Sequence, residues 1–413
     1  MVDDLYPLGL RVRGRLVVVV GGGPVAARRV RGLLAAGATL RAVAPALSDD
    51  LAALVAAGVV EHRARRYKPG DLDGAWLVHT ATGDPAVDSA VADDAEVSRT
   101  FCVVASDADR ASAWVPAVTR SDDVTVAVHA GRDPRRAVRL RDGVAAALEA
   151  GELPLRRVRP PAEADGAGRV ALVGGGPGAP GLVTGRGRRL LASADVVVVD
   201  RLGPRSLLDT LADDVEVIDV GKTAGNHPVP QERINELLVE HARAGRDVVR
   251  LKGGDPYVFG RGGEEMAACR AAGIDVEVVP GVTSAVSVPA AVGIPVTHRG
   301  VAGGFSVLTA HEAVGDVPGG TDHTLVLLMG VTRLARTAEA LVAAGRPADT
   351  PVAVVEDGYG PRQRATLGTL ADIAERAAAA GVRPPAVTVV GDVVRLAPDW
   401  RPHVAPDRVV SAP

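Results

Sequence analysis

The sequence predicts an α/β protein with an N-terminal Rossmann-like domain and a second α/β region made of two lobes. Two glycine turns of the same form support this prediction, because each directly follows a run of buried aliphatic residues. The first turn spans residues 21–24 and the second spans residues 174–177. Between them, residues 151–168 are rich in proline, alanine and glycine, as is typical of a flexible linker.

The N-terminal region begins with a predicted strand, helix and strand. Leu16–Val20 is an unbroken aliphatic run that ends at glycine, which is typical of a buried parallel strand. The helix after Pro24 carries an apolar stripe, and Leu40–Ala44 is the next expected strand. We expect the alternation to continue through strands at 76–80, 100–105 and 125–128. Residues 1–112 are therefore assigned to a dinucleotide-binding type of domain.

Length and composition exclude several classes of protein. A chain of 413 residues can form two or three domains, and with 2% aromatic residues their cores have to consist of valine, leucine and alanine. The formal net charge of −3 argues against a general nucleic-acid-binding protein. No run of about 18 apolar residues predicts a membrane span. The acidic N-terminus does not resemble a secretory leader, so we expect a cytoplasmic protein.

The two cysteines, Cys102 and Cys269, are too few for a disulfide framework or a four-thiolate metal centre. A metal site is therefore left unassigned. The basic residues are almost all arginine, and the three lysines are Lys68, Lys222 and Lys252. Because arginine does not exchange protons at physiological pH, these lysines are the candidates for proton transfer. The alternative for each lysine is that it lies on the surface and has no role in catalysis.

The first glycine turn fits the pattern G-x-G-x-x-A between a strand and a helix. Glycine at Gly21 and Gly23 would allow backbone N–H groups to approach a pyrophosphate at the helix N-terminus. We therefore expect NAD(P) or FAD to bind here. The second strand ends in Val43-Ala44-Pro45, so it lacks the acidic residue that commonly binds ribose hydroxyls. The alternative is a structural glycine turn that binds no cofactor.

An acidic segment, Ser106-Asp107-Ala108-Asp109, follows the strand expected at 100–105. The carboxyl end of a parallel strand is where ligands of this fold class bind. A carboxylate such as Asp107 could transfer a proton or bind a divalent cation there. The alternative is that the segment only caps the element that follows it.

The second region has its highest glycine density between Val248 and Glu265, where a strand leads into Gly253-Gly254-Asp255. Glycines in such number indicate that the backbone approaches a partner closely, and a nucleotide-like ligand is the expected partner. Asp200 and Lys222 each follow a predicted strand of the same region. An acid and an amine at one sheet edge could exchange protons with a substrate, or they could form a salt bridge.

Together these motifs resemble the uroporphyrinogen-III C-methyltransferase family from Arg169 to about Arg401. Residues 8 to about 148 resemble the precorrin-2 dehydrogenase/sirohydrochlorin ferrochelatase domain, and the order of the two domains resembles siroheme synthases. The motifs that carry the resemblance are residues 174–178, 199–202, 220–222, 230–232, 250–265, 279–284 and 295–299.

The resemblance implies that residues 169–413 form a methyltransferase of two α/β lobes, divided near residue 285, that binds S-adenosylmethionine. Its substrate would be uroporphyrinogen III, methylated at C2 and C7 to precorrin-2. The N-terminal domain would oxidise precorrin-2 with NAD to sirohydrochlorin and insert Fe²⁺ as a substrate. Residues 113–150 would form a dimerisation segment and give a homodimer.

The resemblance also assigns individual residues. Asp200 corresponds to the proton acceptor of the methyltransferase and Lys222 to its proton donor. Pro24, Val25, Val43 and Ala44 would lie near the NAD. Contacts to S-adenosylmethionine are implied for Pro177, Gly253, Gly254, Asp255, Val258, Thr283, Ser284, Met329 and Gly358.

Two departures from the family pattern concern acidic residues. The catalytic aspartate of the dehydrogenase domain falls on Ser106 in an ungapped match, so Asp107 replaces it only if the loop shifts. Ala179 stands where the glycine turn of the methyltransferase usually continues into an acid. Two alternatives therefore stay open for the N-terminal domain. It binds NAD or a tetrapyrrole but lacks one or both later activities, or it is an NAD-binding regulatory module.

Overall fold

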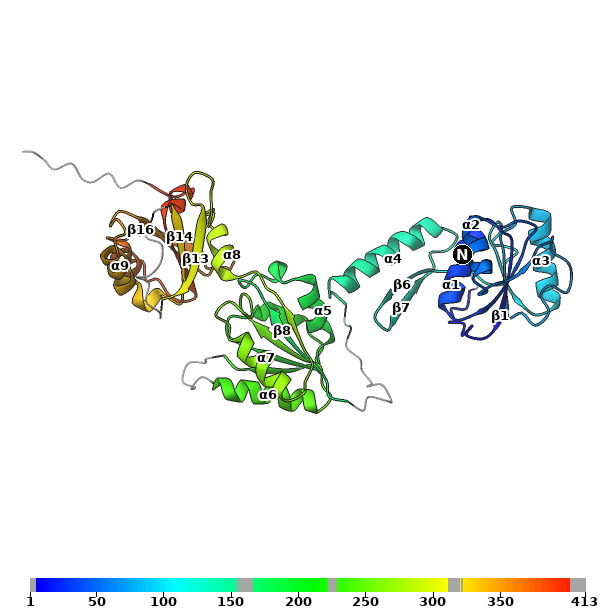
Figure 1. The fold of residues 1–413 in the computed structure, drawn as a ribbon, viewed down its shortest axis with the longest axis horizontal. Coiled ribbons are helices and arrows are strands. Elements are labelled where there is room, and N and C mark those ends of the chain that lie inside the picture. Colours follow the sequence, from blue (N-terminus) through cyan, green and yellow to red (C-terminus); the bar gives the residue numbers. More distant parts are fainter. Residues whose placement is uncertain are drawn as a thin grey trace, which may run out of the picture. The chain divides into compact units, whose positions relative to one another are not determined.

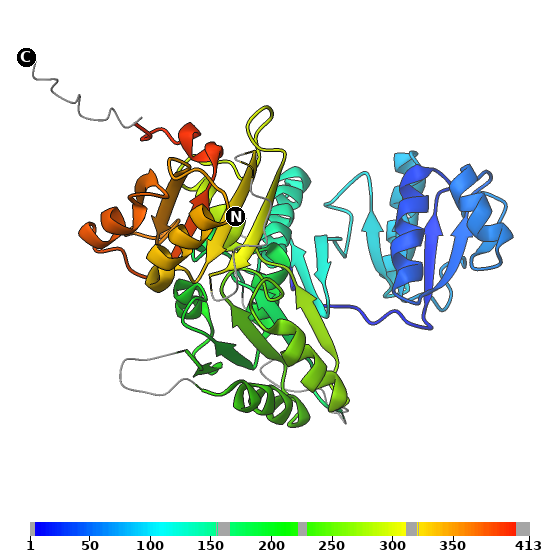
Figure 2. The same cartoon turned by 60° about the vertical axis from the view of Figure 1, so that its left-hand side comes forward.

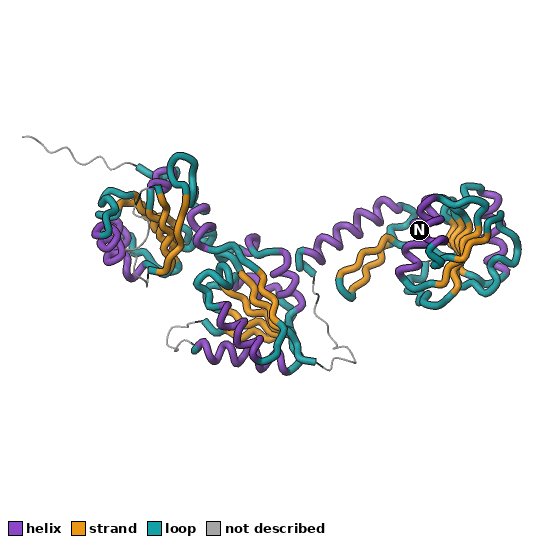
Figure 3. Tube along the Cα trace, in the orientation of Figure 1, coloured by secondary structure: helices purple, strands orange, loops and turns teal. Residues whose placement is uncertain are grey.

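Three five-stranded sheets contain most strands of the structure, a computed structural model that describes residues 5–153, 155, 166–221, 229–310, 320 and 322–401. The chain divides into two compact units, Met1–Ala145 and Ala146–Pro413. Each sheet lies between helices, which confirms the expected α/β class (Figures 1 and 3). Most of the expected linker, residue 154 and residues 156–165, lies outside the described residues.

The first sheet is entirely parallel and has the strand order β3-β2-β1-β4-β5. Helices α1 (Pro24–Ala35) and α2 (Asp49–Ala56) cover one face, and α3 (Pro85–Val97) covers the other (Figure 1). The order reverses between β1 and β4, and this fold binds ligands at the carboxyl ends of the strands at such a point. The strands are β1 (Leu16–Val20), β2 (Thr39–Val43), β3 (Glu61–Arg63), β4 (Leu77–Thr80) and β5 (Phe101–Val104).

The valines of β1 show why this sequence forms a central strand. Val17 and Val19 pack against α1 and α2, whereas Val18 and Val20 pack on the side of α3. All four side chains are buried, as expected for a parallel strand covered on both faces. Among the described residues, the buried apolar side chains are valine, leucine and alanine with a few isoleucines and two cysteines. The prediction of aliphatic cores is confirmed.

The strand expected at residues 125–128 is present, but it does not continue the alternation of strands and helices. That segment is β7 (Val124–Val128), which pairs in antiparallel fashion with β6 (Ala117–Ser121) outside the parallel sheet. Asp122, at a φ of 50°, forms the tight turn between the two strands. The hairpin lies beside α4 (Pro134–Glu149), and Arg141 donates a hydrogen bond to the Val118 carbonyl over 3.2 Å (Figures 1 and 2).

The second sheet is also entirely parallel, but its order is β10-β9-β11-β8-β12. Helix α5 (Gly185–Ser193) packs on one face, and α6 (Gln231–Arg243) and α7 (Gly262–Ala271) pack on the other. The strand before the glycine turn therefore has different neighbours in the two sheets, so the similar turns belong to different folds. The strands are β8 (Val170–Gly174), β9 (Val196–Val199), β10 (Glu216–Asp219), β11 (Val248–Lys252) and β12 (Val276–Val279).

The third sheet is mixed, with the order β13-β14-β17-β15-β16 and parallel pairing between β13 and β14. Helix α8 (Ser284–Ala290) packs on one face, and α9 (Leu334–Ala343) and α10 (Ile373–Ala379) pack on the other. Among the described residues, no helix is long and apolar enough to cross a membrane. The strands are β13 (Gly304–Thr309), β14 (His323–Leu328), β15 (Pro351–Glu356), β16 (Arg364–Thr369) and β17 (Ala386–Val390).

Candidate cofactor and catalytic sites

Four glycines meet backbone to backbone at the carboxyl ends of β8, β11 and β12. Gly254 donates its N–H to the Gly176 carbonyl over 2.7 Å, and Gly176 donates to the Gly254 carbonyl over 3.1 Å. A Cβ on Gly281 would lie 2.1 Å from the Gly254 oxygen and 2.6 Å from the Gly174 Cα. Side chains cannot occupy such a contact. We call these four residues, Gly174, Gly176, Gly254 and Gly281, the glycine junction.

The glycine junction gathers residues predicted to bind the methyl donor. Asp255 accepts the Gly281 N–H at Oδ2 over 3.0 Å and the Tyr257 N–H at Oδ1 over 2.8 Å. Thr283 caps α8, since its Oγ1 accepts the Ala285 N–H. A Cβ on Gly254 would lie 3.6 Å from the Ser284 nitrogen. The predicted residues that the structure brings together here are Pro177, Gly253, Gly254, Asp255, Thr283 and Ser284.

The glycine density of this loop has a different cause from the ligand that the sequence predicts. A Cβ on Gly253 would lie 2.4 Å from the Leu202 Cβ, and one on Gly175 would lie 2.4 Å from the Pro204 Cδ. A Cβ on Gly260 would lie 2.6 Å from the Pro256 oxygen, and one on Gly262 would lie 2.5 Å from it. The glycines thus make room for the protein's own chain, and they require no ligand to explain them.

Two further predicted donor-binding residues belong to the lobe of the third sheet, and a third, Val258 in the loop between β11 and α7, packs against it. Val258 packs against the core that α8 shares with this sheet. A Cβ on Gly358, which follows β15, would lie 2.8 Å from the Val288 side chain of α8. Met329 follows β14, is 51% exposed and has a φ of 56°. Because β14 and β15 both pair antiparallel with β17, Met329 and Gly358 lie at the same edge of the sheet.

Asp200 stands at the carboxyl end of β9, beside the glycine junction. Its Oδ1 accepts the N–H groups of Leu202 and Gly203 over 3.0 and 3.1 Å, and Leu202 contacts Gly253. Its Oδ2 lies 3.5 Å from Arg250 Nη2. The Asp200 side chain is 28% exposed, so a substrate can reach it. Lys222, the predicted proton donor, lies outside the described residues.

A buried cluster of charged residues is connected to Asp200 by Arg250. Arg250 Nε and Lys252 Nζ each donate to Glu265 Oε1 over 3.0 Å, and Gln231 donates to the same oxygen over 3.2 Å. Glu265 is fully buried and its Oε2 has no hydrogen-bond partner. Arg250 and Lys252 carry two positive charges, whereas Glu265 carries one negative charge. Asp200 supplies the second negative charge, because it forms an ion pair with Arg250.

Burial and the charge of Arg250 lower the pKa of Lys252, while Glu265 and Asp200 act in the opposite direction. The rarity of lysine drew attention to Lys252, but the sequence analysis missed Arg250 and Glu265. One signal was available. Residues 250 and 252 are two apart on a strand, so both cations point to the same face of β11.

In the N-terminal glycine turn, Gly21 and Gly22 have no room for a side chain, whereas Gly23 borders open space. A Cβ on Gly21 would lie 2.3 Å from the Ala81 oxygen, and one on Gly22 would lie 1.9 Å from the Ala46 oxygen. A Cβ on Gly23 would meet nothing within 4 Å, and no side chain caps α1 at this residue. Open space before an uncapped helix N-terminus fits the pyrophosphate of a dinucleotide.

The neighbouring residues also fit a dinucleotide. The Ser48 hydroxyl is buried without a hydrogen-bond partner, and its backbone N–H donates to the Gly22 carbonyl over 2.8 Å. Val43 and Ala44 are buried at the end of β2, and His62 Nε2 donates to the Ala44 carbonyl over 2.9 Å. Val25, in the first turn of α1, is 41% exposed.

Asp107 takes part in a local turn after β5. It is exposed, and its Oδ1 accepts the Asp109 N–H over 2.9 Å, which is a local turn. The hydroxyl of Ser106 instead donates to Asp88 Oδ2 over 2.7 Å. Asp88 is a buried carboxylate of α3 that the sequence analysis missed, because nothing in its surroundings in the chain distinguishes it from a surface residue of an amphipathic helix.

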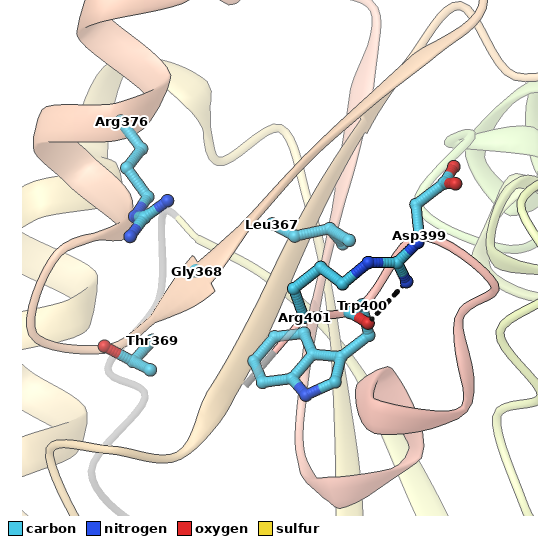
Figure 4. Close-up of a pocket in the computed structure, with 7 residues that line it drawn as sticks. All are labelled: Leu367, Gly368, Thr369, Arg376, Asp399, Trp400 and Arg401. Atoms are coloured by element: carbon cyan, nitrogen blue, oxygen red, sulfur yellow. Dashed lines mark hydrogen bonds between the residues drawn. The ribbon is translucent and has the colours of Figure 1, made fainter. Parts of the chain in front are cut away.

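Two other features of the described residues have no link to these sites. Among the described residues, no group of three or more histidine, cysteine, aspartate or glutamate side chains could hold a metal ion. A pocket beside β16 contains none of the predicted site residues (Figure 4). Its lining consists of Leu367, Gly368, Thr369, Arg376, Asp399, Trp400 and Arg401.

Comparison with known proteins adds an independent line of evidence. Residues 169–374 match the family described as "Tetrapyrrole (Corrin/Porphyrin) Methylases", and residues 8–117 match the family described as "Putative NAD(P)-binding". The chain is 39% identical over 450 residues to the siroheme synthase of Chromobacterium violaceum, covering 95% of this chain and 96% of that protein. It is 37% identical to siroheme synthase 1 of Halorhodospira halophila, and the match covers 98% of this chain and 97% of that protein.

Among solved structures, the chain is similar to uroporphyrin-III-C-methyltransferase from Thermus thermophilus. The two are 43% identical with a TM-score of 0.48, and the match covers 55% of this chain and 94% of the other.

Replacing Gly281 by alanine tests the glycine junction. The added Cβ would have to displace the Gly254 carbonyl, and overpacking of this kind costs about 1–3 kcal/mol. We expect a lower melting temperature and at least a tenfold weaker binding of S-adenosylhomocysteine by calorimetry. The matched control is Gly263→Ala in α7, where a Cβ meets nothing within 4 Å and binding should be unchanged. Wild-type affinity in Gly281→Ala would show that the junction does not shape the site.

Replacing Glu265 by glutamine tests the buried cluster. The change leaves Arg250 and Lys252 without their shared carboxylate, which should lower the free energy of unfolding by about 3–5 kcal/mol. The control is Glu264→Gln, because Glu264 is 54% exposed and its surface pair with Arg261 contributes little to stability. Urea unfolding of the full chain measures both. Equal effects of the two substitutions would contradict the charge balance described here.

Proposed function

Because the chain belongs to the siroheme synthase family, we propose that it converts uroporphyrinogen III into siroheme. The residues after 169 methylate uroporphyrinogen III at C2 and C7 to give precorrin-2. The N-terminal domain then oxidises precorrin-2 to sirohydrochlorin with NAD and inserts Fe²⁺. The observation that carries this proposal is the likeness to curated siroheme synthases over about 95% of the chain, which includes both domains.

Residues around the glycine junction hold the methyl donor. When bound, S-adenosylmethionine supplies a methyl group from a positively charged sulfur. The loops at Gly253–Asp255 and Thr283–Ser284 offer backbone groups on either side of the junction, and Asp255 ties the two loops together through Gly281. This rigid support is what methyl transfer needs, since the reaction depends on holding the donor in line with a pyrrole carbon.

Asp200 takes up the proton that the macrocycle loses on methylation, and Lys222 donates a proton to one position of the macrocycle as a second proton leaves another, so one proton is lost for each methyl group added. Addition of a methyl cation leaves a positive charge on the macrocycle, which loss of a proton removes. Asp200 suits the acceptor role because it is partly exposed, whereas the cations below it are buried. Arg250 Nη2, which lies 3.5 Å from Oδ2, helps to keep the carboxylate in one orientation.

The N-terminal glycine turn holds NAD. The dinucleotide, when bound, accepts a hydride from the tetrapyrrole. The open helix N-terminus at Gly23 binds the pyrophosphate, and the unpartnered Ser48 hydroxyl is available to the adenosine half. With no acidic residue at the end of β2, backbone groups of Val43 and Ala44 line that half.

Residues 113–150 form the surface of a homodimer. Val115, Val138 and Leu140 are each more than 40% exposed on the hairpin-and-helix segment. Apolar side chains gathered on one segment are typical of a protein interface. Sedimentation equilibrium tests this proposal, and a monomer at micromolar concentration would contradict it.

A staged assay separates the proposed activities. Purified chain receives uroporphyrinogen III and S-adenosylmethionine, then NAD⁺, then Fe²⁺, and the absorption spectrum is followed after each addition. We expect the spectra of precorrin-2, sirohydrochlorin and siroheme in that order. No change after NAD⁺, with intact NAD binding, would leave a methyltransferase with an inactive N-terminal domain, the alternative that Ser106 at the expected acid position favours.

Asp200→Ala and Lys222→Ala test the proton-transfer roles. Both variants should lower methyltransferase turnover by about 100-fold or more, because general acid–base catalysis contributes factors of this size. Affinity for S-adenosylhomocysteine, measured by calorimetry, should stay unchanged. Asp209→Ala, at an exposed acid of the same lobe, is the control. Wild-type turnover in the first two variants would remove these roles.

A further inference from the structure

Asp88 is a buried carboxylate surrounded by hydroxyl groups. It lies in α3, is 2% exposed and accepts hydrogen bonds from the side chains of Thr80, Thr82 and Ser106. The Thr82 bond measures 2.6 Å and the Ser106 bond 2.7 Å, and the Thr82 N–H adds a contact of 3.3 Å. Four donors toward one buried carboxylate far exceed what capping of a helix requires.

The position of this cluster in the sheet points to the cofactor. Thr80 ends β4 and Ser106 follows β5, so both lie at the carboxyl edge of the first sheet. Ala81, between the two threonines, is the residue whose oxygen approaches Gly21. Ser48 and Ala44 lie on the β2 side of the same glycine turn. A dinucleotide that crosses this edge with its adenosine half near β2 has its reactive half near β4 and β5.

Ser106 connects the buried carboxylate with the surface. Asp88 is inaccessible, whereas Ser106 is exposed and its hydroxyl is hydrogen-bonded to Asp88 Oδ2. A molecule at the sheet edge therefore contacts the Ser106 hydroxyl, which can transfer its proton to Asp88 Oδ2. Asp107 and Asp109 are exposed and are held in contacts within their loop and with Arg132.

We propose that Asp88 is the proton acceptor of the NAD-dependent oxidation and that Ser106 relays the proton to it; this inference rests on the proposed dehydrogenase function. A C–H bond of the tetrapyrrole breaks, and its hydrogen leaves with both electrons as a hydride to NAD⁺. The macrocycle, now positively charged, gives a proton to Ser106 Oγ while the Ser106 proton moves to Asp88 Oδ2. Two electrons and two hydrogens leave the substrate, as the oxidation requires.

The electrostatics of the cluster suit this step. Burial raises the pKa of Asp88, but the hydrogen bonds from Thr80, Thr82 and Ser106 outweigh burial and lower it below its usual value. The carboxylate is therefore ionised at neutral pH. A weak base suffices, because a macrocycle that has lost a hydride is a cation and a strong acid. A fixed negative charge also stabilises that cation as it forms.

The thiol of Cys102, in β5, is a buried titratable group on which the charge of Asp88 acts. Burial and the nearby carboxylate raise the pKa of the Cys102 thiol to about 11, so it stays protonated and does not compete as a base.

The test uses the full chain with precorrin-2 formed by its own methyltransferase, and measures NADH production in a single turnover. Asp88→Asn keeps hydrogen-bonding capacity but removes basicity, so we expect a loss of about 100-fold or more. Ser106→Ala should also slow oxidation. The double variant Asp88→Asn/Ser106→Asp provides a carboxylate directly at the edge and should recover activity. Asp93→Asn, an exposed acid of the same helix, is the matched control and should behave as wild type.

Two measurements independent of oxidation accompany these rates. Binding of NAD⁺ and the methyltransferase rate should be unchanged in every variant, which excludes misfolding as the cause. Carbon-13 NMR titration of labelled aspartate carboxyls, with Asp88→Asn to assign the signal, should show that Ser106→Ala raises the pKa of Asp88, because one hydroxyl donor is lost.

The outcomes are distinguishable. Wild-type oxidation in Asp88→Asn, or loss in Asp107→Ala alone, would overturn the assignment while leaving the dehydrogenase function intact. Failure of the double variant to recover activity, together with an unchanged pKa in Ser106→Ala, would overturn the relay. A wild-type chain that binds NAD⁺ but never oxidises precorrin-2 would overturn both the inference and the proposed dehydrogenase.

Discussion

Contact between backbones, without side chains between them, is the constraint on which both proposed sites depend. In the second sheet, Gly281 lies against Gly174 and Gly254 so closely that even one methyl group would displace a carbonyl. In the first sheet, Gly21 and Gly22 meet the chain at Ala81 and Ala46 in the same manner. These contacts bring loops from different strands to one sheet edge, and only there can a cofactor be held by backbone groups from several loops at once.

At each of these sheet edges, the exposed or partly exposed catalytic candidate contacts a buried charged residue. Asp200 is partly exposed, but it completes a charge balance with Arg250, Lys252 and Glu265, which are buried. Ser106 is exposed, and its hydroxyl donates a hydrogen bond to the buried Asp88. In both sites a group that a substrate can reach is therefore oriented by a group that it cannot reach. Burial makes this support strong, because a charge or carboxylate without its partners would be costly there.

The sequence predicted features that depend on local patterns and missed those that depend on contacts across the fold. The aliphatic run Leu16–Val20 identified a central strand because burial on both faces demands such residues. The strand Ala117–Ser121, with which the expected strand at 125–128 pairs, was missed because its short, partly polar sequence shows no strong periodicity. Glu265 was missed because its partners lie 13 or more residues away in the chain. Asp88 was missed because its partners, 6 to 18 residues away, lie on or after two neighbouring strands rather than on its own helix. The glycine-rich loop was recognised, but the reason for it, packing against Leu202 and Pro204, became apparent only in three dimensions.

The central claim is that the glycine junction forms the floor of the methyl-donor site. A crystal structure of the full chain with S-adenosylhomocysteine and NAD⁺ tests it most directly. The account predicts S-adenosylhomocysteine against Gly253–Asp255 and Thr283–Ser284, and the NAD pyrophosphate before Gly23. Electron density for S-adenosylhomocysteine only elsewhere, such as in the pocket beside β16, with nothing at the junction at saturating concentration, would contradict it.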